Sequence, residues 1–204
     1  MLRARVYDLL VSRLTGRWYA AVLERLDAES SLLDVGIGTA GALEANAETL
    51  VEKDLRVTGI DIDGDYIRRA RRRLQGTALE NHVELHTESV YDHHGGPYDA
   101  IYFSASFMLL PDPEGALHHC RKLLAPGGRF YFTQTIQQRP SRWMERLKPL
   151  LRRFTSIDFG RVTYEEDFRA QLRAGGLELE EFHCLGRHGA RAYFLAVARP
   201  AGQA

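Results

Sequence analysis

The chain has few cysteines, no net charge and no long apolar run, and each of these shortages excludes a class of protein. Among 204 residues there are two cysteines, Cys120 and Cys184, without C-x-x-C spacing. This argues against a zinc site or a disulfide framework and suits a reducing compartment, so we expect two core thiols. The 27 basic and 27 acidic side chains cancel. No overall field therefore attracts nucleic acid or a membrane surface.

The absence of certain segments also limits the possibilities. No window approaches the roughly 18 consecutive apolar residues of a membrane-spanning helix, and residues 1–14 lack the apolar centre of a secretory signal. We expect a cytoplasmic protein. The histidine pairs His93-His94 and His118-His119 cannot direct both rings the same way, so we predict no metal site. His93 and His94 precede Gly95-Gly96-Pro97, in a loop that we expect to be solvated.

The most informative segment is Leu-Leu-Asp-Val-Gly-Ile-Gly-Thr-Ala-Gly, residues 32–41. It reads as a buried strand that runs into a glycine turn and then into a helix. Gly36 and Gly38 have no Cβ, so the backbone can turn tightly and approach a ligand closely, while Gly41 lets the helix pack near its strand. The helix presents free N–H groups to whatever lies over the turn. This pattern predicts a nucleotide-cofactor loop.

A second strand, residues 55–61, supports that interpretation. It ends in Asp61, about 20 residues beyond the last glycine, where dinucleotide-binding folds place their ribose ligand. We interpret Asp61 as an acceptor for ribose hydroxyls. The alternative is that Asp61 or Asp63 caps the next helix, residues 65–74, and we assign that role to Asp63.

The remaining elements alternate between strands and helices. Strands are expected at 82–86, 98–103 and 129–135, with helices between them on Leu43-Ala47-Leu50, on Ile67-Ala70-Leu74 and over 116–124, and with a break at Pro126-Gly127-Gly128. Two further strands, 177–185 and 190–198, are joined by Gly186-Arg187-His188-Gly189, which is too short for a crossover helix. We predict an α/β, Rossmann-like, doubly wound fold of three α/β/α layers. Its seven-stranded sheet is mostly parallel, with an antiparallel C-terminal strand.

Four motifs in this order resemble the class I S-adenosylmethionine-dependent methyltransferases of the small-molecule type. They are Asp34 to Thr39, Gly59 to Asp63, Tyr98 to Ile101 and Leu123 to Arg129. The resemblance implies S-adenosylmethionine as cofactor and S-adenosylhomocysteine as product. It places Asp34, Gly36, Gly38 and Thr39 around the methionine half and Asp61 at the ribose. Ile62 would pack on the adenine face, and Ser104 follows the fourth strand where it could touch the cofactor.

One position departs from the family pattern. Where the family has Gly-Asp-Ala after its third strand, this chain has Glu88-Ser89-Val90. A hydroxyl accepts a hydrogen bond from the adenine amino group more weakly than a carboxylate does. We expect Ser89 to take over that contact in part, and the Val90 amide to donate to the adenine ring.

Two regions are predicted to cover the acceptor. Residues 1–30 form an N-terminal helical cap, interrupted at Thr15-Gly16, and residues 137–163 form a lid whose basic stretch 139–154 could contact lipid weakly. Thr163 should cap the helix that follows, with Glu166 completing a capping box. Pocket-wall candidates are Tyr7, Trp18, Tyr19, Phe107, Phe159 and Tyr164, although Phe107 also suits core packing. Conceivable bases are Tyr7, Asp158, Tyr164 and His188, with none preferred.

We therefore predict one methyltransferase domain over 1–204, with its cofactor core at 32–135 and a helix and hairpin at 164–198. It would methylate a small apolar or amphipathic acceptor, with no nucleic-acid partner. Three alternatives stay open: a nicotinamide-dependent oxidoreductase, since G-x-G-x-x-G with Asp61 suits NAD as well; a methyltransferase acting on nucleic acid or protein; and a non-catalytic binding module. The sequence does not indicate the oligomeric state.

Overall fold

The computed structural model describes residues 15–137, 164–189 and 191–202. Several sequence predictions lie outside these ranges. They are the pocket candidates Tyr7 and Phe159, the conceivable base Asp158, the helix cap Thr163 and the lid over 138–163.

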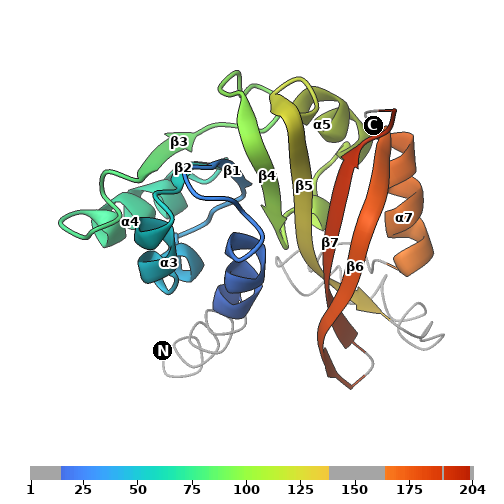
Figure 1. The fold of residues 1–204 in the computed structure, drawn as a ribbon, viewed down its shortest axis with the longest axis horizontal. Coiled ribbons are helices and arrows are strands. Elements are labelled where there is room, and N and C mark those ends of the chain that lie inside the picture. Colours follow the sequence, from blue (N-terminus) through green and yellow to red (C-terminus); the bar gives the residue numbers. More distant parts are fainter. Residues whose placement is uncertain (1–14, 138–163, 190, 203–204) are drawn as a thin grey trace, which may run out of the picture.

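A seven-stranded sheet in the order β3-β2-β1-β4-β5-β7-β6 forms the centre of the molecule (Figure 1). The strands are β1 (Ser31–Val35), β2 (Arg56–Asp61), β3 (Val83–Thr87), β4 (Tyr98–Ser104), β5 (Leu124–Gln137), β6 (Leu177–His188) and β7 (Arg191–Pro200). The first five are parallel, whereas β7 runs antiparallel to both β5 and β6. This confirms the predicted sheet and its antiparallel C-terminal strand.

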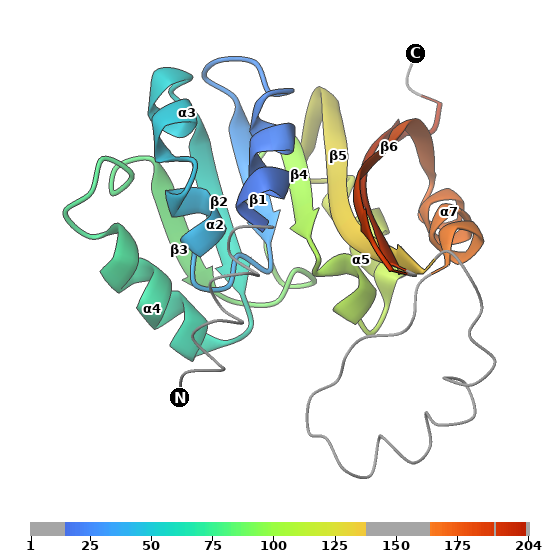
Figure 2. The ribbon, with the colours of Figure 1, turned by 90° about the horizontal axis from the view of Figure 1, so that it is seen from below.

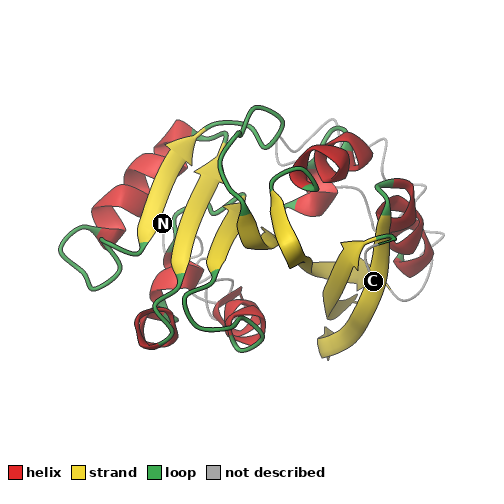
Figure 3. Cartoon of the chain, turned by 45° about the horizontal axis from the view of Figure 1, so that its top comes forward, coloured by secondary structure: helices red, strands yellow, loops and turns green. Residues whose placement is uncertain are grey.

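Helices cover both faces of the sheet, as Figures 2 and 3 show. One face packs against a helix over 15–23 and against α2 (Gly41–Glu44), α3 (Ala47–Glu52) and α4 (Gly64–Leu74). The other packs against the 3-10 helix η1 (Phe107–Leu109), α5 (Pro113–Cys120) and α7 (Glu165–Ala174). Two buried apolar clusters, one on each side of the sheet, confirm the three layers.

The last two strands are longer than predicted. Gly186, Arg187 and His188 belong to β6 and pair with Tyr193, Ala192 and Arg191, so they are not the connecting loop. The register shifts between Cys184 and Gly186, where Leu185 is the extra residue, and Gly186 continues the ladder. The same effect lengthens β5, whose pairing with β4 begins at Leu124, with a shift across the Pro-Gly-Gly segment. Glycine therefore marks irregular pairing here, not the end of a strand.

The helix boundaries also need correction. Thr15 and Gly16 are the first described residues of the helix over 15–23, and the Gly16 carbonyl accepts from the Asn46 side-chain amide at 3.0 Å. Asn46 also precedes α3, so the apolar positions at 43, 47 and 50 occupy two short helices. Helix α7 follows Tyr164, whose side chain makes no cap bond, and the predicted capping box involves Thr163, which lies outside the described residues.

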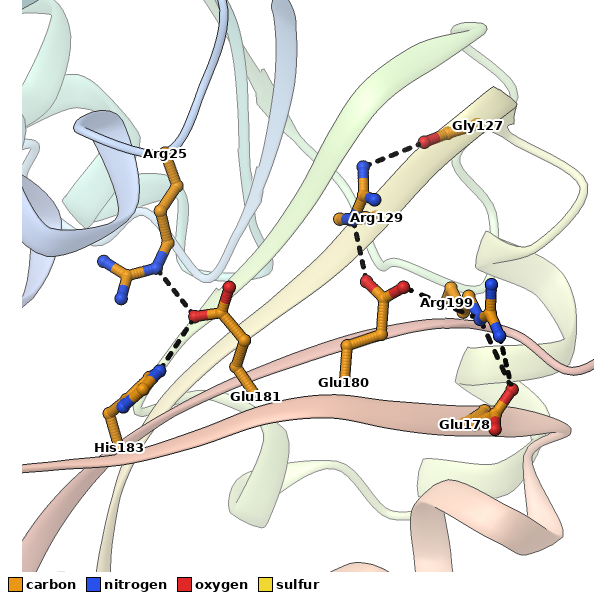
Figure 4. Close-up of polar contacts among 8 residues, drawn as sticks. All are labelled: Arg25, Gly127, Arg129, Glu178, Glu180, Glu181, His183 and Arg199. Atoms are coloured by element: carbon orange, nitrogen blue, oxygen red, sulfur yellow. Dashed lines mark hydrogen bonds and ion pairs between the residues drawn. The ribbon is translucent and has the colours of Figure 1, made fainter. Parts of the chain in front are cut away.

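Charged side chains tie the outer strands together on one face (Figure 4). Glu180 on β6 binds Arg129 on β5 at 2.7 Å, and Glu178 binds Arg199 on β7 at 3.1 Å. Glu181 accepts from Arg25 at 3.1 Å and lies 3.0 Å from His183. Exposed pairs of this kind each contribute little to stability.

Two further findings concern residue environments. Cys120 is buried, and burial raises the pKa of its thiol to about 12, whereas Cys184 is exposed. The expectation of two core thiols is therefore wrong for Cys184. Within the described residues, no helix is long and apolar enough to cross a membrane.

Candidate functional site

The glycine turn after β1 forms as the sequence predicts. The N–H groups of Gly36 and Ile37 donate to the Ile60 carbonyl at 2.8 and 3.1 Å, which holds the turn against the end of β2. Gly36 and Gly38 have φ of 82° and 60°, a region that only glycine enters readily. The Ser106 hydroxyl donates to the Val35 carbonyl and fixes the turn to the end of β4.

The two turn glycines do different things. A Cβ on Gly36 would lie 2.7 Å from the Ser106 Cβ, so protein packing already requires glycine at this position. A Cβ on Gly38 would meet no described atom within 4 Å. The space above Gly38 is therefore open, as a ligand passing over the turn would need.

The third glycine of the motif does not have its predicted role. A Cβ on Gly41 would meet the guanidinium end of Arg73 on α4, not strand β1. The close approach occurs instead at Gly59 on β2, where a Cβ would lie 3.0 Å from Leu85 and would clash with the side chain of Ile37. The packing role of Gly59 depends on the neighbouring strands, so the sequence motif alone does not indicate it.

Asp34 is the most unusual side chain of the site. It lies on β1 between Gly59 and Tyr102, is fully buried, and has no hydrogen-bond partner for either carboxylate oxygen among the described residues. Burial and, secondarily, the nearby Asp61 raise its pKa well above the ordinary value. A buried carboxylate normally has a donor or a cation beside it. Asp34 is thus suited to a ligand that brings a positively charged donor.

Asp61 connects the ends of two strands. Its Oδ2 accepts from the Gly38 N–H at 3.0 Å and its Oδ1 accepts from the Asp63 N–H at 2.9 Å, so the carboxylate lies directly beside the open glycine turn. Each oxygen keeps a further lone pair for a hydroxyl. Asp63 caps α4 by accepting from the Asp65 N–H at 2.8 Å, which confirms its assigned role. Next to Asp61, the Ile62 side chain is 79% exposed, an unusual place for an apolar group of this size.

The segment after β3 lies along the same edge. The Glu88 N–H donates to the Asp61 carbonyl at 3.1 Å, so Glu88-Ser89-Val90 begins at the candidate ribose site. Ser89 Oγ accepts from the Tyr91 N–H at 3.3 Å, which uses one of its lone pairs, while the Val90 side chain is buried. The second lone pair of the Ser89 hydroxyl stays available to accept a hydrogen bond from a ligand.

His93 is not in a solvated loop. Its side chain is buried, with Nδ1 2.6 Å from Glu88 Oε1 and Nε2 2.8 Å from the Tyr98 hydroxyl. A Cβ on Gly95 would lie 2.6 Å from His93 Nε2, so the glycine makes room for the ring. The Gly95-Gly96-Pro97 segment predicts a turn in solvent, whereas Gly95 allows close packing. His94 is exposed, as expected.

The end of β4 brings polar side chains to the middle of the sheet. Ser104 pairs with Thr133 of β5, and the next residue, Ala105, has a φ of 55°. A positive φ at alanine is strained and is often found at functional sites. Behind Ser104, the Tyr102 hydroxyl lies 2.6 Å from Thr133 Oγ1, and burial raises the pKa of Tyr102.

The described pocket candidates lie apart from one another. Phe107 is in the core, with its ring against Phe103 and Phe132, which favours the packing interpretation. Trp18 and Tyr19 are buried on the opposite face of the sheet, and neither Trp18 Nε1 nor the Tyr19 hydroxyl has a partner within the described ranges. Tyr164 is partly buried at the start of α7.

The sequence interpretation missed Gln134. This residue is 2% exposed on β5, one position beyond the Ser104–Thr133 pair, and neither atom of its amide has a described partner. Its signal in the sequence was an amide within the apolar-rich run from Phe130 to Ile136. Buried amides without partners are rare and require an explanation.

Hydrogen bonds thus bring Gly38, Asp61 and Glu88 together, and the charge of Asp61 raises the pKa of Asp34 beside them. All follow or end parallel strands, at the carboxyl edge where open sheets of this kind bind ligands. Within the described ranges, no group of three or more His, Cys, Asp or Glu side chains is placed to hold a metal ion. The site suits an organic cofactor with a cationic group, vicinal hydroxyls and a flat apolar ring.

Comparison with known sequences agrees with this geometry. A family model described as a methyltransferase domain matches residues 33–130. The ubiquinone biosynthesis O-methyltransferase of Pectobacterium atrosepticum is 32% identical over 114 residues, which cover 55% of this chain and 45% of that protein. The enzyme of the same name from Cronobacter sakazakii is 28% identical over 165 residues, or 77% of this chain and 64% of the relative. The chain spans about half the length of most of these relatives.

Solved structures show the same fold. A geranyl diphosphate methyltransferase in complex with S-adenosylmethionine has a TM-score of 0.71 at 15% identity and covers 93% of this chain and 86% of its own. The mitomycin 7-O-methyltransferase MmcR gives 0.69 at 18%, covering 91% and 54%. The cyclase SpnF gives 0.73 at 20%, covering 94% and 82%. A cyclase shares this architecture, so the fold alone does not determine the reaction.

Proposed function

We propose that this chain, which belongs to the class I S-adenosylmethionine-dependent methyltransferase family, transfers a methyl group from that cofactor to a small apolar or amphipathic acceptor. The observation that carries the proposal is the buried carboxylate of Asp34 close to Asp61 and the glycine turn. The amino group of the methionine half is a cationic donor of the kind that this carboxylate lacks, and the methionine chain needs the open space above Gly38.

Each part of the cofactor matches a group along the carboxyl edge of the sheet. The turn N–H groups and Asp34 would hold the methionine half, and Asp61 would accept from the ribose hydroxyls, since a carboxylate oxygen accepts two hydrogen bonds. The exposed Ile62 side chain offers an apolar surface to one adenine face. Ser89 and the Val90 N–H would contact the adenine edge.

When bound, the cofactor supplies an activated methyl group on a sulfonium with a good leaving group. The protein then has to align the acceptor with that methyl group and exclude water. A general base is required only if the acceptor must lose a proton, and we assign none. Thr39 follows β1 and Ser104 ends β4, and the two would flank the cofactor on either side of its reactive centre.

An apolar or amphipathic acceptor is supported by composition and by the relatives. The chain has no net charge, and the buried side chains at the end of β4 are aromatic. The relatives are named for ubiquinone biosynthesis, mitomycin and geranyl diphosphate, all of them small molecules. We extend to this chain only the class that these names share.

Two experiments test the proposal. Purified protein should release S-adenosylmethionine or S-adenosylhomocysteine on denaturation, detected by mass spectrometry, and repeated absence would favour a non-catalytic module. Incubation of the protein with methyl-labelled cofactor and a cell extract should then place label in the organic-solvent phase. Label found in the nucleic-acid or protein precipitate would contradict the proposed acceptor class.

A further inference from the structure

We propose that Glu88, His93 and Tyr98 form a buried clasp that fixes the Ser89-Val90 turn in the position from which it recognises the adenine edge of the cofactor. This proposal rests on the proposed function. It assigns a positioning role to three side chains, none of which is itself required to touch the cofactor.

The clasp closes a short segment on itself. Glu88 and His93 stand at its two ends, and their side chains meet at 2.6 Å between Oε1 and Nδ1. An ionised carboxylate can only accept, so Nδ1 carries the proton. In the tautomer that carries its proton on Nδ1 alone, Nε2 accepts from the Tyr98 hydroxyl, which lies 2.8 Å away. The hydrogen bonds of this tautomer therefore run in one direction, from the Tyr98 hydroxyl through the His93 ring to the Glu88 carboxylate.

The clasp is anchored in the core and on the neighbouring elements. The His93 side chain is only 5% exposed, and its ring stacks on that of Tyr98 with centroids 5.8 Å apart. The His93 carbonyl accepts from His119 Nε2 on α5 at 2.7 Å. At the other end, the Glu88 N–H is bound to the Asp61 carbonyl. The segment is therefore fixed to β2, to β4 and to α5.

Between these anchors lies the turn that the cofactor would meet. The Asp92 N–H donates to the Ser89 carbonyl at 3.0 Å, and the Tyr91 hydroxyl accepts from the Asp112 N–H at 3.0 Å. Ser89 and Val90 can offer a ligand only a hydroxyl and a backbone N–H, in place of a carboxylate. Neutral hydrogen bonds of this kind are weaker and depend on direction, so they need a rigid turn. The clasp supplies that rigidity.

The test compares S-adenosylhomocysteine with its 6-oxo analogue, S-inosylhomocysteine, by titration calorimetry. The analogue inverts the donor and acceptor pattern of the adenine edge and leaves the rest of the molecule unchanged. The parent protein should prefer S-adenosylhomocysteine. Glu88→Ala and His93→Ala should bind it about tenfold more weakly, a loss of about 1.4 kcal/mol, and should lose most of the preference. Tyr98→Phe should show a smaller change in the same direction.

Two variants serve as controls. Glu88→Gln keeps an oxygen that accepts from Nδ1, so it should retain both affinity and preference. His183→Ala removes a histidine that is also paired with a glutamate, at 3.0 Å, but on β6 at the far edge of the sheet from β3. It should leave binding unchanged. Circular dichroism and thermal unfolding of every variant separate lost binding from lost fold.

Every result of this comparison either supports the clasp or overturns it. If His93→Ala does not fold, the comparison of Glu88→Ala with Glu88→Gln stands in its place, because the Glu88 side chain is 30% exposed. Equal weakening of both ligands, with the preference intact, would mean a merely structural role and would overturn the clasp. So would a parent that binds both ligands equally. A parent that binds neither ligand would refute the proposed function itself, and the clasp with it.

Discussion

Replacement of Asp34 by asparagine should stabilise the protein without its cofactor and should also weaken cofactor binding. The Asp34 side chain is fully buried and its oxygens have no described partner. Burial first, and then Asp61, raise its pKa well above the ordinary value. Near neutral pH, ionisation of Asp34 lowers the free energy of the unfolded chain, and the raised pKa makes the same ionisation less favourable in the unliganded folded chain. Asparagine removes that difference.

The sign of the pH dependence follows from the raised pKa. A carboxyl whose pKa is higher in the folded state holds its proton more tightly there. Its contribution to stability is present below the unfolded pKa, about 3.9, and is lost as the pH rises toward the raised value. An unpartnered buried polar group lowers the free energy of unfolding by about 1–3 kcal/mol, and asparagine removes only the share of this loss that comes from ionisation. We expect a gain near neutral pH of about 1 kcal/mol, or about 2–4 °C in Tm for a chain of this size.

Thermal unfolding followed by circular dichroism at neutral pH and near pH ~4, about the ordinary carboxyl pKa, measures this effect. The gain of Asp34→Asn over the parent should shrink toward zero at the lower pH. Calorimetry should show that the parent releases a proton when it binds S-adenosylhomocysteine, because the ligand ammonium favours the ionised carboxylate, and that the variant releases none and binds more weakly. Asp63→Asn is the control, since asparagine also caps helices. A lower Tm at neutral pH together with unchanged affinity would refute the reasoning.

Three other predictions concern single residues. Gly38→Ala should abolish cofactor binding. Gly127 also has a positive φ and open space around it, so Gly127→Ala should cost similar stability and leave binding unchanged. Equal binding by both variants would exclude the turn as the binding site. Asp61→Ala should weaken binding of S-adenosylhomocysteine by about 1.5–3 kcal/mol with an unchanged circular dichroism spectrum, and full affinity in calorimetry would remove the ribose assignment. Gln134→Leu should raise the Tm of the unliganded protein, because it removes an unpartnered buried amide, and a clear fall in Tm would mean that the amide is bonded in the folded state.

The sequence predicted the core of the fold because parallel strands and glycine turns leave local signals. The apolar run before Gly36 and the strand that ends at Asp61 appear almost where they were expected. The cap at Asp63 could also be predicted, because helix capping depends on neighbouring residues only. The antiparallel C-terminal strand could be predicted because the connection between the last two strands is too short for a crossover helix.

What could not be predicted depends on contacts between distant segments. Gly95 resembles any turn glycine, and only the folded chain shows that it makes room for the ring of His93. Gly59 and Gln134 acquire their meaning from strands that lie beside them in the sheet and not in the sequence. Asp34 could be assigned to the motif, but its lack of partners and its raised pKa depend on the layers that bury it.

The most direct test of the central claim is a calorimetric titration of the purified parent chain with S-adenosylhomocysteine and, separately, with NADH. The arrangement of Asp34, Gly38 and Asp61 predicts saturable, one-to-one binding of S-adenosylhomocysteine at micromolar affinity and no response to NADH. Micromolar binding of NADH without any response to S-adenosylhomocysteine would contradict the account and favour a nicotinamide-dependent oxidoreductase.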